Sequence, residues 1–140
     1  MNLYNNLLPA RAISPIADSS DNTVLVSEIL DTQGFEEVLL LILIGSLADA
    51  AATFTVLIES GDDSGLSDNV AVDDAFLQVD EANVSFDEAD DNTVRRIGIV
   101  PPERYLRATI TPAGNAGVAF FCACWLSGKA RHAPVTAQAT

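Results

Sequence analysis

Residue types that usually carry chemistry are scarce in this sequence. Its 140 residues include two Cys, one His and one Trp. Cys122 and Cys124 lie two positions apart on a predicted strand, so both face the same side and the geometry for bridging them is poor. A structural zinc site needs further Cys or His ligands, and His132 is the only histidine. We interpret the cysteines as buried free thiols, which suit a reducing compartment, and predict neither metal nor cofactor.

Catalytic arrangements are also missing. His132 lies in a predicted tail, and no third group completes a nucleophile–base arrangement with the cysteines. Paired carboxylates can hydrolyse glycosides, but no acidic pair here is marked by an aromatic sugar platform, and Trp125 lies in a strand that we predict to be buried. We therefore predict that the protein is not an enzyme.

Long hydrophobic runs are absent as well. The longest, Val38 to Ala48, ends at Asp49, whereas a membrane-spanning helix needs about 20 residues. The N-terminal sequence MNLYNNLLPARAISP has no basic start and no long apolar stretch, so we expect no secretory signal. The sequence predicts no membrane association.

Basic residues are few. Seven basic residues face 20 acidic ones, which gives a formal net charge of −13, and such a surface repels nucleic acid. Most acids lie between Glu59 and Asp91, and every basic residue except Arg11 comes later. Opposite patches could orient copies of the chain or a partner lattice during docking; a solvated acidic face that aids solubility is the alternative.

Two acidic stretches could supply oxygen ligands to calcium. Neither has the spacing of an EF-hand loop, so solvated loop acids are the alternative to an irregular calcium site. The residues concerned are Asp62, Asp63, Ser64 and Asp68 in the first stretch, and Asp87, Glu88, Asp90 and Asp91 in the second.

What the sequence does contain is a series of β-like segments. Val118 to Leu126 is apolar at every position, which predicts a strand covered on one face by a core and on the other by something else. Phe35 to Ile44 is predicted as a strand because Gly34 and Gly45 bound it and its neighbours are β-like, although its leucines favour a helix. Further strands are predicted at residues 23–30, 53–59, 94–100 and 104–111, with short pieces at 70–79 and 84–86.

These segments, separated by turn signals at short intervals, predict an all-β, single-domain, jelly-roll-like β-sandwich with extended N- and C-terminal arms. We place the N-terminal arm at residues 1–20, the body at 21–127 and the C-terminal tail at 128–140. A short strand is expected within the N-terminal arm, at residues 7–13.

Two groups of residues are candidates for contacts with other chains. The first consists of apolar residues in the N-terminal arm, which could pack onto a sister subunit, unless that terminus is disordered: Leu3, Tyr4, Leu7 and Leu8. The second combines the residue types favoured at interface hot spots: Arg104, Tyr105 and Arg107. The alternative for these arginines is pairing with local acids, such as Glu103 or the loop at residues 87–91.

Three phrases carry a resemblance to a known family: RYLRATITPAGNAG before an apolar strand, GFEEVLLLILIGSLADAAATFTVLIESGDDSG, and SDNVAVDDAFL. Together they resemble the cement (capsid decoration) proteins of Bordetella-type tailed bacteriophages, between Ile13 and Val135. The resemblance implies a jelly-roll-like sandwich, a homodimer at two-fold positions, and the major capsid protein as partner. It places the protein on the capsid exterior of a virion that assembles in the host bacterial cytoplasm.

The composition also favours assembly, because 49% hydrophobic residues is high for a soluble monomer. We therefore predict a structural virion protein that binds the outer surface of a phage capsid and cements neighbouring major capsid subunits. The alternative is a carbohydrate- or receptor-binding β-sandwich module, as in a tail fibre or a lectin-like domain.

Overall fold

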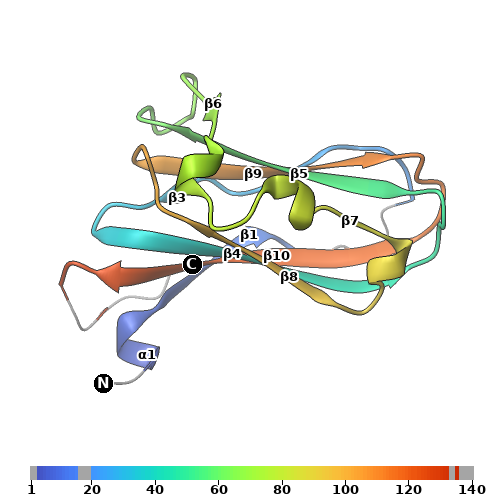
Figure 1. The fold of residues 1–140 in the computed structure, drawn as a ribbon, viewed down its shortest axis with the longest axis horizontal. Helices are drawn as coiled ribbons and strands as arrows, with labels where there is room; N and C mark the ends of the chain where they lie inside the picture. The colour runs from blue at the N-terminus through green and yellow to red at the C-terminus, as the bar shows by residue number, and fades with distance from the viewer. Residues whose placement is uncertain (1–2, 16–19, 133–134, 136–140) are drawn as a thin grey trace.

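Strands with alternating burial build two antiparallel sheets that pack face to face (Figure 1). The computed structural model describes residues 3–15, 20–132 and 135. Sheet A has the strand order β1–β10–β4–β8. Its members are β1 (Leu8–Ile13), β10 (Ala119–Ala130), β4 (Phe35–Leu47) and β8 (Val94–Ile99).

Sheet B is centred on two long strands and bordered by short ones. The long strands are β9 (Tyr105–Ala113) and β5 (Thr53–Gly61). The strands β2 (Leu25–Val26) and β3 (Leu30–Asp31) pair with β9, and β6 (Val70–Ala71) and β7 (Phe86–Asp87) pair with β5. The helices are α1 (Leu3–Asn6) and the short 3-10 helices η1 (Asp74–Phe76), η2 (Glu81–Asn83) and η3 (Glu88–Asp90).

The chain passes repeatedly from one sheet to the other. It runs from β3 in sheet B to β4 in sheet A and back to β5, and the last three strands alternate between the sheets again. Such crossing is typical of jelly-roll-like sandwiches. The predicted all-β sandwich is confirmed, and no described helix is long and apolar enough to cross a membrane.

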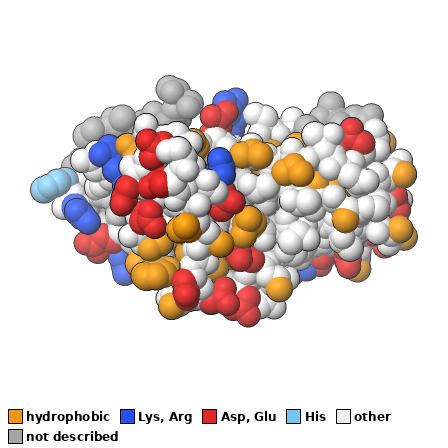
Figure 2. Space-filling view, turned by 90° about the horizontal axis from the view of Figure 1, so that it is seen from above, with side chains coloured by type: hydrophobic (Ala, Val, Ile, Leu, Met, Phe, Trp, Pro, Cys, Tyr) orange, Lys and Arg blue, Asp and Glu red, His pale blue; other side chains and the backbone are white. Residues whose placement is uncertain are grey.

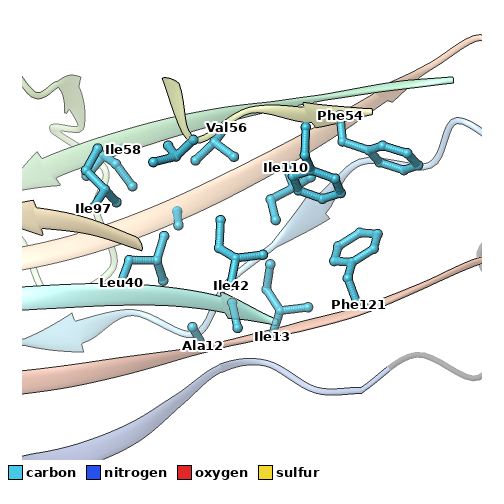
Figure 3. Close-up of a cluster of buried hydrophobic side chains, with 14 of the residues drawn as sticks. Ala12, Ile13, Leu40, Ile42, Phe54, Val56, Ile58, Ile97, Ile110 and Phe121 are labelled. Atoms are coloured by element: carbon cyan, nitrogen blue, oxygen red, sulfur yellow. The ribbon is translucent and has the colours of Figure 1, made fainter. Parts of the chain in front are cut away.

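Side chains from both sheets fill the space between the layers (Figure 3). At one end Phe54 stacks on Phe86 with ring centroids 4.9 Å apart, and Phe121 meets both rings edge-on at 5.5 and 5.3 Å. Trp125 is fully buried, and its indole N–H donates to the backbone carbonyl of Glu28. Burying apolar surface at about 25 cal/mol per Å² holds the sheets together.

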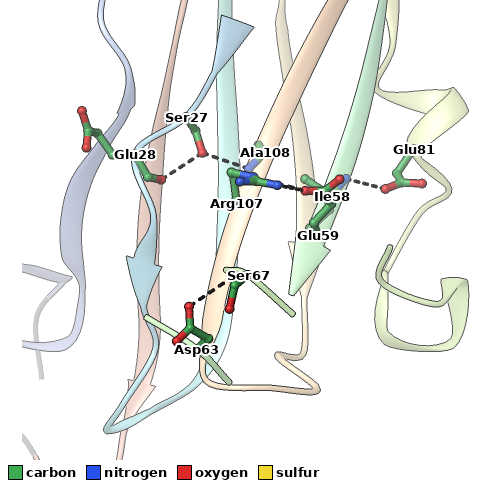
Figure 4. A network of polar contacts seen from close by, with 9 residues as sticks. All are labelled: Ser27, Glu28, Ile58, Glu59, Asp63, Ser67, Glu81, Arg107 and Ala108. Carbon is green, nitrogen blue, oxygen red and sulfur yellow. Dashed lines mark hydrogen bonds and ion pairs between the residues drawn. The ribbon is translucent and has the colours of Figure 1, made fainter. Parts of the chain in front are cut away.

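Polar side chains complete the edges of sheet B (Figure 4). The backbone N–H of Ala108 donates to the Ser27 hydroxyl, which donates to the carbonyl oxygen of Glu28. On the other side, the N–H of Ile58 donates to the Glu81 carboxylate at 2.6 Å. Burial raises the pKa of Glu81. These contacts satisfy backbone groups where the neighbouring strands are too short to do so.

Phe35–Leu47 is a strand, as predicted, but it does not end before Gly45: it continues to Leu47, because Leu47 still pairs with Ala119 of β10. From Glu37 onward its residues alternate between half-buried and fully buried positions up to Ile42, the period-two pattern of a strand. The helix preference of its leucines is overridden because β10 and β8 pair along both of its edges.

The structure places the boundaries between the arms and the body differently from the prediction. Leu8–Ile13 is strand β1, as the short predicted strand implies, and it belongs to the sandwich because it pairs with β10 and buries Ala12 and Ile13. Strand β10 continues to Ala130, past the predicted body boundary at residue 127, because its end pairs with Phe35 and Glu37. Much of the predicted C-terminal tail, and residues 1–2 and 16–19 of the N-terminal arm, lie outside the described residues.

Candidate docking face

Strands β10 and β4 present an apolar surface on the side of sheet A that faces away from sheet B. Their inward residues, among them Trp125 and Leu40, are fully buried. Because side chains alternate along a strand, the residues between them point outward. We call this set the outer face of sheet A; it comprises Leu39, Leu41, Leu43, Phe120, Cys122, Cys124 and Leu126.

The strand register aligns these residues in rows across the sheet. Leu126 lies opposite Leu39, Cys124 opposite Leu41, and Cys122 opposite Leu43. Leu43 is 42% exposed and Phe120 is 40% exposed, and the other members are half-buried. Among the described residues, no segment therefore covers the end of the face that Leu43 and Phe120 occupy.

Shallow hollows lie at the two ends of this face. The first, of about 200 Å³, is lined by Leu7, Leu39, Gly98 and Leu126 among others. The second, of about 330 Å³, has a lining that includes Pro15, Leu43, Gly45, Phe120 and Cys122. Exposed apolar patches are typical of surfaces that bind other molecules, so this face is the candidate docking surface.

Arginines stand at both edges of the middle row. On β1, Arg11 lies opposite Cys124, and on β8, Arg96 lies opposite Leu41. Arg11 forms an exposed ion pair with Glu28 at 3.3 Å. Arg96 is exposed and forms no ion pair with any described carboxylate.

The lack of an ion pair at Arg96 is unusual in so acidic a chain. Of the seven basic residues, five form salt bridges within the described part of the chain: Arg11, Arg95, Arg104, Arg107 and Lys129. Arg131, near the C-terminus and exposed, resembles Arg96 in forming none there.

Sheet B presents a different surface on its own outward side. Threonines occupy facing positions on β5 and β9, with Thr55 opposite Thr111, and the Arg107–Glu59 ion pair lies further along. Figure 2, which looks down from above Figure 1, shows acidic side chains gathered at the end of the molecule that carries β6. The centre of sheet B is thus polar on its outward side, although Val26 and Val70 on its bordering strands are exposed, whereas the centre of sheet A is apolar on its outward side.

The N-terminal candidates lie close to the outer face of sheet A. Leu3 and Tyr4 are 76% and 74% exposed on α1, which projects from the sheet A side of the sandwich (Figure 1). Leu7 lines the hollow of 200 Å³. Leu8 instead belongs to β1, opposite the buried Ser127, and lines a separate hollow beside Trp125.

The second group of candidates lies on the other sheet and is engaged in local contacts. Arg104 donates to both carboxylate oxygens of Asp31, at 2.9 and 2.8 Å, and its guanidinium lies 5.1 Å from the ring centroid of Tyr105. This pairing lowers the pKa of Asp31 and raises that of Arg104. Arg107 pairs with Glu59 on the neighbouring strand (Figure 4).

The arginine partners are therefore not the acids that the sequence suggested, Glu103 and the loop at 87–91. The reason is strand register, since Asp31 lies opposite Tyr105, and Glu59 opposite Arg107. The structure thus separates the two groups of predicted interface residues, one beside the outer face of sheet A and the other on sheet B.

In the first acidic stretch, side-chain carboxylates accept hydrogen bonds from backbone N–H groups. The carboxylate of Asp68 accepts the N–H groups of Asp62 and Asp63 at 2.9 and 3.2 Å. Asp63 accepts the N–H group of Gly65 and that of Ser67 (Figure 4), and the bonds from Ser67 lower its pKa. Among the described residues, no group of three His, Cys, Asp or Glu is placed to hold a metal ion.

The second acidic stretch also organises turns. Asp87 and Asp90 form a capping box around η3, and Asp90 pairs with Arg95. Asp91 accepts the backbone N–H of Leu47 at 2.9 Å. These acids stabilise loops by accepting backbone hydrogen bonds.

Sequence reasoning missed Leu39, Leu41, Leu43 and Arg96 as surface residues. The continuous apolar run of β4 does not show which residues face inward, since both alternating sets are hydrophobic. The apolar run of β10 did indicate such a surface, because a strand that is hydrophobic on both faces is expected to be covered on both. Only the pairing of β4 with β10 shows that their outward residues form one surface.

Comparisons with known proteins do not identify what binds to this surface. No protein-family model matches the chain, and no curated protein matches it. Among solved structures, the chain is similar to a xylan-binding module, CBM15, with 9% sequence identity and a TM-score of 0.39 over 94% of this chain and 96% of that one. A likeness at this level assigns neither a family nor a ligand to the chain.

Proposed function

We propose that this protein is a non-enzymatic β-sandwich module that binds another protein through the outer face of sheet A. The observation that carries the proposal is the continuous apolar surface formed by β10 and β4, open at Leu43 and Phe120. Covering it with a complementary surface removes apolar area from water, the main driving force of most protein association.

The finer form of the proposal is a cement protein on the outside of a phage capsid, with the major capsid protein as partner. Its support is the resemblance of the sequence to phage cement proteins and the exposed apolar residues Leu3 and Tyr4 beside the docking face. Repetition of weak contacts over a symmetric shell strengthens attachment through multivalency. A homodimer belongs to the same proposal, and light scattering of the free protein tests it.

The deciding experiment is co-sedimentation of the purified protein with empty phage shells, comparing wild type with Leu41→Glu. Leu41 is central in the outer face and lies opposite Arg96, so a carboxylate there should weaken binding by at least about tenfold, because it removes apolar contact area, must be desolvated, and occupies Arg96 in place of the partner. Thr55→Glu, an acid added to the opposite side of the sandwich, is the matched control and should bind like wild type.

Each outcome addresses one part of the proposal. Failure of the wild type to bind shells would overturn the capsid role. Normal binding by Leu41→Glu, with the same unfolding midpoint as Thr55→Glu, would show that the outer face of sheet A is not the contact.

A polar hollow at one end of the sandwich supports a second candidate, a carbohydrate-binding module. Its volume is about 590 Å³ and its lining includes Gln33, Phe35, Asp62, Glu103 and Arg104. Ligand sites commonly measure about 300–1,000 Å³ and combine apolar walls with a few polar groups. Binding to a glycan array that is lost in Gln33→Ala but kept in Leu41→Glu would favour this candidate over the docking proposal.

A further inference from the structure

The apolar part of the outer face of sheet A is two strands wide. At its middle row strands β10 and β4 supply it, and the flanking strands place arginines beside it: Arg11 on β1 and Arg96 on β8. In the rows on either side, Pro9 of β1 lies opposite Leu126 and Val94 of β8 lies opposite Leu43, so the apolar surface runs diagonally across the sheet. With neighbouring strands about 4.8 Å apart, the stripe is about 10 Å wide. One α-helix with its side chains is about 10–12 Å across.

The length of the stripe also suits a helix. From Phe120 to Leu126 the strand β10 advances about 20 Å at about 3.3 Å per residue, which equals about 13 residues of α-helix. The two hollows lie at opposite ends of this stripe, where they can receive large apolar side chains. A helix laid along β4 and β10 would cover the row of Leu41 and Cys124 and end over the hollows.

Arg96 specifies the charge of the occupant. It lies in the same row as Leu41 and Cys124, and no described carboxylate pairs with it, although the chain has 20 acidic residues. An acidic side chain on the flank of the occupant would meet this guanidinium at the border of the apolar stripe. Complementary charge at such a rim sets orientation and selects partners.

A second copy of the chain fits this face less well. A second sheet would cover all four strands, including the arginines at the edges. A two-fold axis that runs across the strands through the middle row places Arg96 against its own counterpart, and an axis along the strands places it against Arg11. The first arrangement brings like charges together, and the second sets Arg96 against an arginine whose carboxylate partner, Glu28, is already engaged.

We infer, on the basis of the proposed docking function, that the occupant of the outer face of sheet A is an amphipathic α-helix of a partner protein. Its apolar ridge lies along β4 and β10, and acidic residues on one flank pair with Arg96. This inference goes beyond the docking proposal because it specifies the conformation and the charge of the partner segment.

Two synthetic helical peptides of about 18 residues, about one turn longer than the stripe, test the inference, with the same leucine ridge and either Glu or Lys along one flank. Fluorescence anisotropy with the full-length chain should show the Glu peptide binding at least about tenfold more tightly than the Lys peptide. Arg96→Glu should reverse this preference. Arg131→Glu makes the same change in charge away from the face and should keep the wild-type preference.

The outcomes separate this inference from the docking proposal. Equal binding of both peptides, or an unchanged preference in Arg96→Glu, would overturn the acidic flank. If neither peptide binds while shell binding still depends on Leu41, the helix inference fails and the docking proposal stands. If the free chain forms a dimer that Leu41→Glu dissociates, a second copy is the occupant and the inference is wrong.

Discussion

Arg107 lies on β9 and Arg104 lies directly before it, but the two arginines differ in how much water reaches their ion pairs. In the Arg107–Glu59 pair the side chains are 23% and 14% exposed, and in the Arg104–Asp31 pair they are 44% and 46% exposed. Exposed pairs contribute about 0–1 kcal/mol. Removing one partner of a less exposed pair costs more, because the remaining charge is left desolvated.

We therefore expect Arg107→Leu to lower the free energy of unfolding by about 1–3 kcal/mol, and Arg104→Leu to lower it by less than about 1 kcal/mol. Urea unfolding monitored by Trp125 fluorescence measures both. The double variant Arg107→Leu/Glu59→Leu should recover part of the loss, since no unpaired charge remains. Equal losses in the two single variants would show that Glu59 is solvated well enough to tolerate the loss of Arg107.

Strand β10 is the element that joins the core to the docking face. Consecutive residues on it point to opposite sides: Phe121 is 4% exposed within the cluster of three phenylalanines, and Phe120 is 40% exposed on the outer face. One strand therefore supplies both the stability of the sandwich and the surface that we propose for binding.

This division predicts unequal effects of the same truncation at adjacent positions. Phe121→Ala should lower the free energy of unfolding by about 3–5 kcal/mol, because it leaves a cavity between Phe54 and Phe86. Phe120→Ala should cost less than about 1 kcal/mol and should weaken shell binding instead. Chemical denaturation and co-sedimentation of the two variants measure this. A large loss of stability in Phe120→Ala would show that this end of the face is packed in the free chain.

The sequence was most informative about the long strands and least informative about which strands pair with each other. The apolar run of β4 that follows Gly34 and the apolar run of β10 indicated two strands without any structure, although Gly45, expected to end the first, lies within it. The isolated position of Arg96 depends on which strand β8 pairs with, and no local pattern encodes that. The short strands β2, β3, β6 and β7 have only two residues each, so their existence rests on contacts with β9 and β5 rather than on their own propensities.

At the scale of the whole molecule, the sandwich has two unlike sides. The negative charge that keeps copies of the chain apart in solution is carried largely by loops and by the side of sheet B, whereas the outer face of sheet A is apolar and bordered by arginines. Attachment through sheet A would leave the acidic side facing solvent. A coated particle would then present a surface of net negative charge, which opposes aggregation between particles.

The two thiols on the outer face of sheet A report directly on whether that face is covered. Cys122 and Cys124 are free and half-buried. Burial raises the pKa of the Cys124 thiol, and the neighbouring Cys122 adds to this. The thiolate is the reactive form, so Cys124 should react more slowly near pH 7 than it would with the ordinary pKa of a thiol.

We expect N-ethylmaleimide to modify both cysteines in the free protein and to modify them at least about tenfold more slowly when the protein is bound to shells, since thiol reactivity requires access. Peptide mass spectrometry after timed quenching measures the two rates separately. Urea-unfolded protein is the control, in which both thiols should react fully. Protein alkylated beforehand should also bind shells weakly, because the adduct projects from the middle of the stripe. Equal rates in the bound and free protein would place the contact elsewhere on the sandwich, on sheet B or on α1 alone.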